Sequence, residues 1–114
     1  QVFDVVSYKT KVASGLEKHH GVLDVWASNN IPEYNRYEAP TMVLTAEQHM
    51  ATRTYFASWR IANTGSLTGF VDWGNMSPQE IQGIAYGMFD AAGVPEDAVQ
   101  NYFRAFNQYL YGSG

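Results

Sequence analysis

The sequence predicts a mostly helical α+β fold. Two capping boxes carry this prediction, because each is followed by a stretch with helical periodicity. A short apolar run of strand length just before the first capping box supplies the β component. The chain has 114 residues, of which 46% are hydrophobic. That length fits one domain, and that composition is enough to bury a core without disulfides.

The first 44 residues predict short strands separated by a loop. Residues 2–6 are β-prone but few. Residues 16–23 are ambiguous, since their apolar positions suit either a helix face or a strand. Residues 28–41 are rich in Ser, Asn and Pro and predict a loop. Residues 41–44 are apolar and predict a short buried strand.

The first long helix is predicted from its N-terminal signal. Thr45 and Gln48 have the spacing of a capping box. The helix should run over about 46–62 and end before Gly65. His49 then falls in its first turn, and further residues follow on the same side at helical spacing: Arg53, Phe56 and Arg60.

Two more amphipathic helices are predicted in the C-terminal part, at about 77–112. Ser77 and Glu80 form a second capping box, with proline at the first helical position. This helix should span about 78–92, and the last one about 96–111. Both carry regular apolar stripes, which we expect to be core rather than chemistry.

Composition excludes several function classes. The chain has no cysteine, which rules out disulfides and thiolate metal sites. It has no apolar run near the roughly 20 residues of a membrane span, and we expect no membrane association. It starts at Gln1 rather than at methionine, from which we expect a domain taken from a longer chain.

The net charge of −4 is unevenly distributed. Residues 1–60 hold six Lys or Arg and six Asp or Glu, whereas residues 61–114 hold one Arg and five acidic residues. The acidic excess therefore lies in the second half. The charge is compatible with a nucleic-acid enzyme but does not by itself favour one.

The three histidines are the residues most able to carry chemistry. His19 and His20 are adjacent, and on an extended segment their side chains should point opposite ways. His49 can present its ring from the start of the helix. Hydrolysis of a phosphodiester needs a base, a cation to stabilise charge on phosphorus, and a proton for the leaving oxygen. Histidines in this arrangement can act as the base and can bind the cation.

The sequence around these histidines resembles the HNH/endonuclease VII superfamily, and in particular the nuclease toxin domains at the C-termini of Rhs-type and other polymorphic bacterial toxins. The resemblance spans most of the chain from about Leu16. It rests on Glu17-Lys18-His19-His20, Asn35 and Thr45-Ala46-Glu47-Gln48-His49, together with residues 64–69, 88–95 and 103–112.

The resemblance implies a ββα-metal (His-Me finger) core over about 16–62 and a role for each site residue. His19 would be a metal ligand and His20 the general base, although the two roles could be exchanged. Asn35 would brace the loop and orient the base, with Asn30 as the alternative. His49 would be the second metal ligand.

The sequence departs from the family pattern at one position. Many members have another histidine four residues after the helix histidine, where this chain has Arg53. Arginine is permanently cationic and cannot bind a metal, but it can hold the scissile phosphate. With few protein ligands the divalent ion could be Mg²⁺, Mn²⁺ or Zn²⁺. Reserve ligands are Glu17, Asp24 and Glu47.

Each of these residues also has a purely structural interpretation. Without the resemblance, His19 and His20 could be half-exposed surface residues, and His49 could bond a loop carbonyl. Asn35 could be an ordinary turn residue and Arg53 a solvated helix residue. Most tryptophans and tyrosines are expected in the core rather than stacked on bases.

The resemblance implies one nuclease toxin domain over residues 1–114, forming part of a larger secreted effector. The expected function is a metal-dependent DNase, delivered for instance by type VI secretion, that acts in the target-cell cytoplasm during interbacterial competition. A cognate immunity protein would protect the producer. Two alternatives stay open: an RNase toxin of the same delivery class, and a non-enzymatic partner-binding domain of a secretion apparatus.

Overall fold

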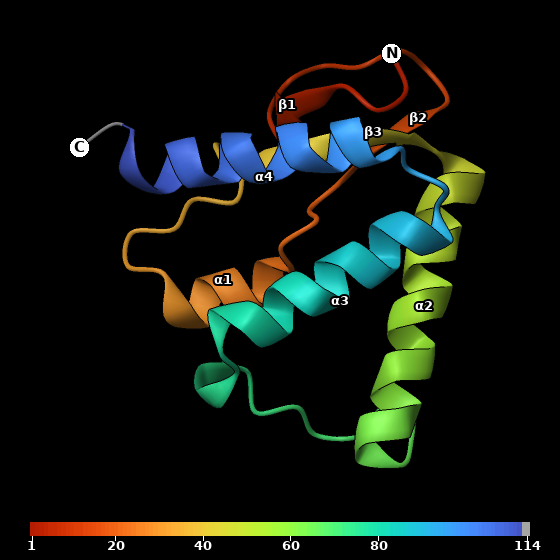
Figure 1. Cartoon of the computed structure of the whole chain (residues 1–114), viewed down its shortest axis with the longest axis vertical. Coiled ribbons are helices and arrows are strands. Elements are labelled where there is room, and N and C mark those ends of the chain that lie inside the picture. The colour runs from red at the N-terminus through yellow and green to blue at the C-terminus, as the bar shows by residue number, and fades with distance from the viewer. Residues whose placement is uncertain (113–114) are drawn as a thin grey trace.

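A computed structural model describes residues 1–112 of the chain; residues 113–114, the end of the predicted domain, lie outside the described residues. It is an α+β fold, mostly helical, with a small sheet (Figure 1). No helix within residues 1–112 is long and apolar enough to cross a membrane. The elements in chain order are β1 (Val5–Ser7), β2 (Leu16–His19), α1 (Asp24–Asn30), β3 (Pro40–Thr45), α2 (Ala46–Thr64), the 3-10 turn η1 (Trp73–Asn75), α3 (Pro78–Ala91) and α4 (Glu96–Tyr111).

The sheet is antiparallel, with the order β1-β3-β2. Its central strand β3 is the apolar run predicted at 41–44, and it is buried from Pro40 to Leu44. The ambiguous segment 16–23 proves to be strand up to His19, which pairs with Met42. The predicted loop is shorter than expected at its start, because α1 extends to Asn30.

Helix α2 begins and ends where local signals place it. The Thr45 hydroxyl accepts a hydrogen bond from the Gln48 amide at 3.1 Å, and the Gln48 side chain accepts one from the Thr45 amide at 2.8 Å. Gly65 ends the helix in the left-handed conformation, with φ of 91°. The strands β2 and β3 followed by α2 form the expected ββα unit, with α1 inserted between the strands.

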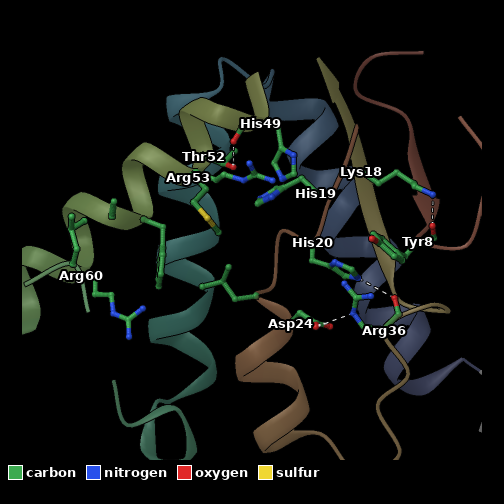
Figure 2. A pocket seen from close by; sticks show the side chains of 15 residues that line it. Tyr8, Lys18, His19, His20, Asp24, Arg36, His49, Thr52, Arg53 and Arg60 are labelled. Atoms are coloured by element: carbon green, nitrogen blue, oxygen red, sulfur yellow. Dashed lines mark hydrogen bonds and ion pairs between the residues drawn. The ribbon is translucent and has the colours of Figure 1, made fainter. Parts of the chain in front are cut away.

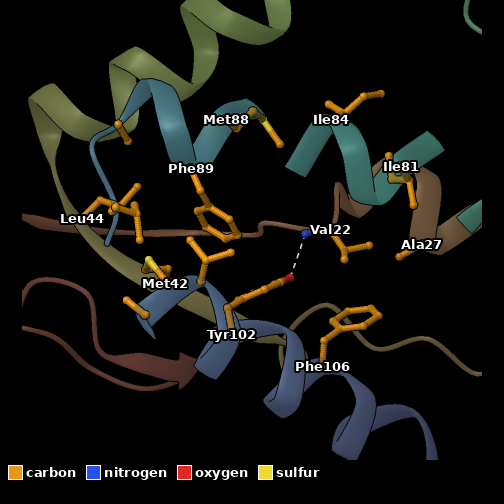
Figure 3. Packing of buried hydrophobic residues seen from close by; sticks show 14 of the residues in the cluster. Val22, Ala27, Met42, Leu44, Ile81, Ile84, Met88, Phe89, Tyr102 and Phe106 are labelled. Atoms are coloured by element: carbon orange, nitrogen blue, oxygen red, sulfur yellow. Dashed lines mark hydrogen bonds between the residues drawn. The ribbon is translucent and has the colours of Figure 1, made fainter. Parts of the chain in front are cut away.

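The C-terminal helices complete the core. The Ser77 capping box starts α3, and Gly93 with φ of 74° follows its end. Helix α3 packs against α2, and α4 packs against the sheet at β3. Figure 3 shows where the buried apolar side chains of these elements meet, among them Met42, Phe89 and Tyr102.

The segment that follows the paired histidines is anchored to this core. A Cβ atom at Gly21 would lie 2.5 Å from the Phe89 ring and 2.9 Å from the Tyr102 ring, so only glycine fits there. The fully buried Tyr102 hydroxyl accepts a hydrogen bond from the Val22 amide at 2.7 Å (Figure 3). The C-terminal helices therefore fix the backbone one residue after His20.

We expect Tyr102→Phe to lower the free energy of unfolding by about 1–3 kcal/mol, because it leaves the buried Val22 amide without a partner. Urea denaturation measures this difference. Tyr111→Phe is the matched control, since Tyr111 is 76% exposed and should tolerate the same change. Equal stability of both variants would show that the Tyr102 bond does not anchor the segment.

Candidate functional site

A pocket of about 450 Å³ lies between β2, α1, α2 and the loop before β3 (Figure 2). All three histidines line it. Among the described residues that line it, four are Lys or Arg and one is a carboxylate: Lys18, Arg36, Arg53, Arg60 and Asp24. The pocket is therefore cationic although the chain as a whole is acidic, and it suits an anion such as a phosphate.

His19 ends β2 and is almost fully buried, with 5% of its surface exposed. Its Nε2 atom is buried and has no hydrogen-bond partner among the described residues. Such atoms are rare in folded proteins, and a ring nitrogen in this state is free to bind a water molecule or an ion. Burial, together with the nearby His49, lowers the pKa of His19 from 6.5 to about 3, so the ring is neutral and keeps a lone pair.

His49 lies in the first turn of α2, and its ring centroid is 5.3 Å from that of His19. Its Nδ1 atom is 2.6 Å from the Glu17 carboxylate on β2. A carboxylate in this position orients the ring and holds the proton on Nδ1, which leaves Nε2 as the electron-pair donor. Metal-binding histidines commonly have this kind of second partner.

His20 lies just beyond the end of β2, with its ring stacked on Tyr8 at 4.8 Å. Its Nε2 atom is 3.0 Å from the Arg36 carbonyl oxygen (Figure 2). Because a carbonyl only accepts, Nε2 must donate, and the neutral ring has an unprotonated Nδ1. Burial is the main cause that lowers the pKa of His20, which favours this neutral form.

The expected alternation of the two adjacent histidines is only partly correct. Both line the same pocket, because β2 ends at His19 and His20 leaves the strand geometry. Their rings nevertheless have different neighbours: His19 contacts His49 and Phe89, and His20 contacts Tyr8. The pocket thus contains two separate imidazole environments.

Asn35 is exposed and does not line the pocket, but it shapes the loop beside it. Its side-chain oxygen accepts a hydrogen bond from the Tyr37 amide at 2.9 Å, across Arg36. It is thus a turn residue around the carbonyl that holds His20. The alternative, Asn30, caps the end of α1 through bonds to the Trp26 and Trp73 carbonyls.

Asp24 joins this loop to α1. Its carboxylate accepts hydrogen bonds from Tyr34 at 2.7 Å and from Arg36 Nε at 3.1 Å. The Arg36 guanidinium also lies over the Tyr8 ring at 4.6 Å. Arg36 and Tyr8 were not predicted as site residues, because a contact through a backbone carbonyl and a ring stacking across the sheet leave no sequence motif.

The reserve ligands are separated by the structure. Glu17 contacts His49, Asp24 is engaged by Tyr34 and Arg36, and Glu47 lines a different shallow groove beside Met50. Within residues 1–112 no group of three or more His, Asp or Glu side chains is arranged to hold a metal ion. Any ion here would have the two histidines as its main protein ligands.

His19 and His49 lie close enough together to bind one metal ion. Metal-to-nitrogen bonds of about 2.1 Å place the ring centroids of two imidazoles on one ion within about 6.5 Å of each other. The observed 5.3 Å between His19 and His49 meets this limit. The buried Nε2 of His19 has no hydrogen-bond partner within residues 1–112 and is therefore available to an ion. The donor set therefore suits a divalent ion completed by water and substrate oxygens.

Arg53 and Arg60 line the pocket from α2, at the helical spacing expected from the sequence. Arg53 is exposed and lies one turn after His49, about 6 Å further along the helix axis. Arg60 donates from Nε to the Gly69 carbonyl at 2.9 Å. The two guanidinium groups give the α2 side of the pocket its positive charge.

The structure is a ββα unit in which a strand and a helix bring histidines into one cationic pocket. Residues 13–111 match the family model Tox-SHH, described as an HNH/Endo VII superfamily toxin with a SHH signature. The chain belongs to this family, and its class is that of nuclease toxins, which are hydrolases. No solved structure matches the chain. The match confirms the superfamily expected from the sequence and includes all three histidines.

Asp24→Asn should lower the rate of nucleic-acid cleavage about ten- to a hundredfold, because a loosened Arg36 carbonyl misplaces His20. The free energy of unfolding should change by about 1 kcal/mol or less, since the ion pair is partly exposed. Initial cleavage rates and urea melts measure the two effects.

Glu38→Gln is the matched control for this variant, because it breaks another exposed ion pair, with Lys9 at 2.8 Å, that does not line the pocket. Equal cleavage rates for both variants would contradict a positioning role of Asp24.

Proposed function

We propose that this protein is a metal-dependent endonuclease whose cation is held by His19 and His49 and whose general base is His20. One observation carries the proposal. The buried, unpartnered Nε2 atom of His19 lies in the same pocket as His49, with 5.3 Å between the ring centroids, beside a third imidazole in a different environment. This division separates cation binding from proton transfer.

His20 is suited to accept a proton from water. The Arg36 carbonyl fixes the tautomer, so Nδ1 carries the lone pair, and burial favours the uncharged ring. Stacking on Tyr8 limits rotation of the imidazole. A base held in this way removes a proton from water as it attacks phosphorus, which contributes about 10²–10⁴ to the rate. We propose Asn35 as a positioning residue, through the turn around Arg36.

His19 and His49 would hold the divalent ion. When bound, the ion stabilises the negative charge that develops on the phosphoryl and leaving oxygens. The residues themselves do the rest: Glu17 orients His49, and burial keeps His19 neutral and therefore able to bind a cation. Zn²⁺ binds imidazole readily, whereas Mg²⁺ and Mn²⁺ prefer oxygen ligands and would depend more on water and phosphate oxygens. Cleavage assays with each ion identify the one used.

Arg53 is the proposed phosphate clamp. It lies in the pocket on the same helix as His49 and carries a permanent charge. Lys18 adds charge from the other wall, although its ammonium already donates to the Tyr8 and Thr10 carbonyls. The pocket thus holds the scissile phosphate between two elements of the ββα unit.

We further propose DNA as the substrate and a role as the toxin domain of a larger, delivered effector. The toxin family supports this proposal. The domain would span residues 1–114, with the catalytic core at 16–62, and would act in the cytoplasm of a target cell, for example from an Rhs-type or type VI effector. A cognate immunity protein would be needed. Co-expression with the product of the adjacent gene should restore growth, and continued toxicity would argue against that partner.

His20→Ala should reduce cleavage of supercoiled plasmid at least a hundredfold while the protein keeps its thermal stability. The same preparation is tested on structured RNA, since the pocket holds no base-reading element that would decide the substrate in advance. Nicked and linear plasmid are quantified on gels over time. Full plasmid cleavage by this variant contradicts the assignment of the base, and cleavage of RNA alone contradicts DNA as the substrate.

Removal of divalent ions by EDTA should abolish cleavage, and Glu17→Gln should weaken metal affinity about 10–100-fold, because it alters the carboxylate that orients His49. Isothermal titration with Mn²⁺ and Zn²⁺ measures the affinity. Glu47→Gln is the matched control, as Glu47 lines a separate groove. Cleavage that persists in EDTA would contradict the metal-dependent mechanism.

A further inference from the structure

The loop between α2 and η1, residues 65–72, presents two large apolar side chains to solvent. Phe70 is 82% exposed and Leu67 is 60% exposed. A single exposed apolar side chain is ordinary. Here the two side chains lie on a loop that contacts the cationic pocket, so they can bind the same ligand as the pocket.

The loop is held in a defined shape by its hydrogen bonds and glycines. The Thr64 hydroxyl donates to the Arg60 carbonyl at 2.8 Å, and the Gly69 amide donates to the Ser66 carbonyl at 3.3 Å. A Cβ atom at Gly69 would lie 1.9 Å from the Thr64 hydroxyl, so the close approach of these two residues requires glycine. The loop therefore positions the neighbouring Phe70 instead of leaving it free.

Arg60 links this loop to the pocket. Its Nε atom donates to the Gly69 carbonyl, one residue before Phe70, at 2.9 Å. Both Arg60 and Leu67 line the pocket that contains the histidines. Since a guanidinium has five N–H donors, this one bond leaves others for a phosphate.

Helix α2 sets the spacing along this surface. Figure 2 shows Arg60 on α2, further along the helix than His49 and Arg53. Arg60 lies eleven positions after His49, which is about 16 Å along the helix axis. In duplex DNA a strand advances about 3.4 Å per nucleotide, so about five nucleotides span that distance, and an extended single strand needs fewer. The pocket and the loop are thus within reach of one strand.

We propose that Arg60, Leu67 and Phe70 form a strand-binding subsite, in which Arg60 contacts a phosphate and Phe70 stacks on an unpaired base a few nucleotides from the cleaved bond. The proposal rests on the proposed nuclease function and adds the form of the substrate to it. A nucleic acid is favoured over a protein partner because the loop continues a pocket with four cations and one carboxylate among its described lining residues. Stacking needs a base with an open face, which a single strand offers and an intact duplex does not.

Binding to a single-stranded oligonucleotide tests this proposal. Fluorescence anisotropy with a labelled 12-mer is measured in the His20→Ala background, so that hydrolysis does not interfere. Phe70→Ala should raise Kd about tenfold, within the range that stacking of one base supports. Phe70→Tyr should bind within about twofold of the parent, because the ring is kept. A blunt duplex of the same sequence should lose much less on Phe70→Ala.

Tyr111→Ala is the matched control, because Tyr111 is also highly exposed but lies at the end of α4. Unchanged Kd on Phe70→Ala, or an equal loss on Tyr111→Ala, would overturn the subsite. Arg60→Gln should lower the slope of log Kd against log salt by about one, whereas Phe70→Ala should leave it unchanged, because the ring carries no charge. A salt slope that falls equally in both variants would also contradict stacking by Phe70.

The subsite and the nuclease function can fail independently. Wild-type cleavage of plasmid or RNA is measured beside the binding assay. Active enzyme with Phe70-independent binding overturns the subsite alone. Absence of cleavage under all metal conditions overturns the nuclease mechanism, whatever the binding result.

Discussion

The histidine pocket depends on one contact between segments far apart in the sequence. Gly21 passes so close to Phe89 and Tyr102 that no side chain fits, and the Tyr102 hydroxyl bonds the Val22 amide at 2.7 Å. This contact joins the histidine-bearing end of β2 to the two C-terminal helices. Those helices carry no proposed catalytic group, yet they fix the backbone position of the paired histidines. The ββα unit carries the proposed catalytic residues, and the C-terminal helices position it.

The positive charge of the pocket and the state of its histidines come from the placement and burial of residues rather than from the composition of the chain. The chain carries a net charge of −4, but its acidic excess lies in the second half, and four of the six Lys and Arg residues within residues 1–60 line the pocket. Burial keeps His19 neutral, and a backbone carbonyl fixes the tautomer of His20. The imidazoles offer groups that can bind a metal or accept a proton, and the neighbouring cations can hold a phosphate in the same pocket.

Local signals in the sequence predicted the helices well. The capping boxes at Thr45 and Ser77 are formed as expected, because each depends only on residues three apart. The helix spacing of Arg53 and Arg60 also holds in the pocket. Contacts over long separations could not be predicted in this way. The Arg36 carbonyl that bonds His20 has no side-chain signature. Within the segment 16–23, only Leu16–His19 is a strand, which forms by pairing with β3. Asn35 lies beside the pocket and does not line it, and this placement also depends on long-range contacts that have no sequence motif.

The central claim is that His19 and His49 share one divalent cation. Anomalous diffraction from crystals of the protein soaked in Mn²⁺ tests it most directly. A single strong peak is expected within bonding distance of the His19 Nε2 atom and of the His49 ring. A peak at another place with none between these rings, or histidine rings that remain without any ion at saturating Mn²⁺, would contradict it.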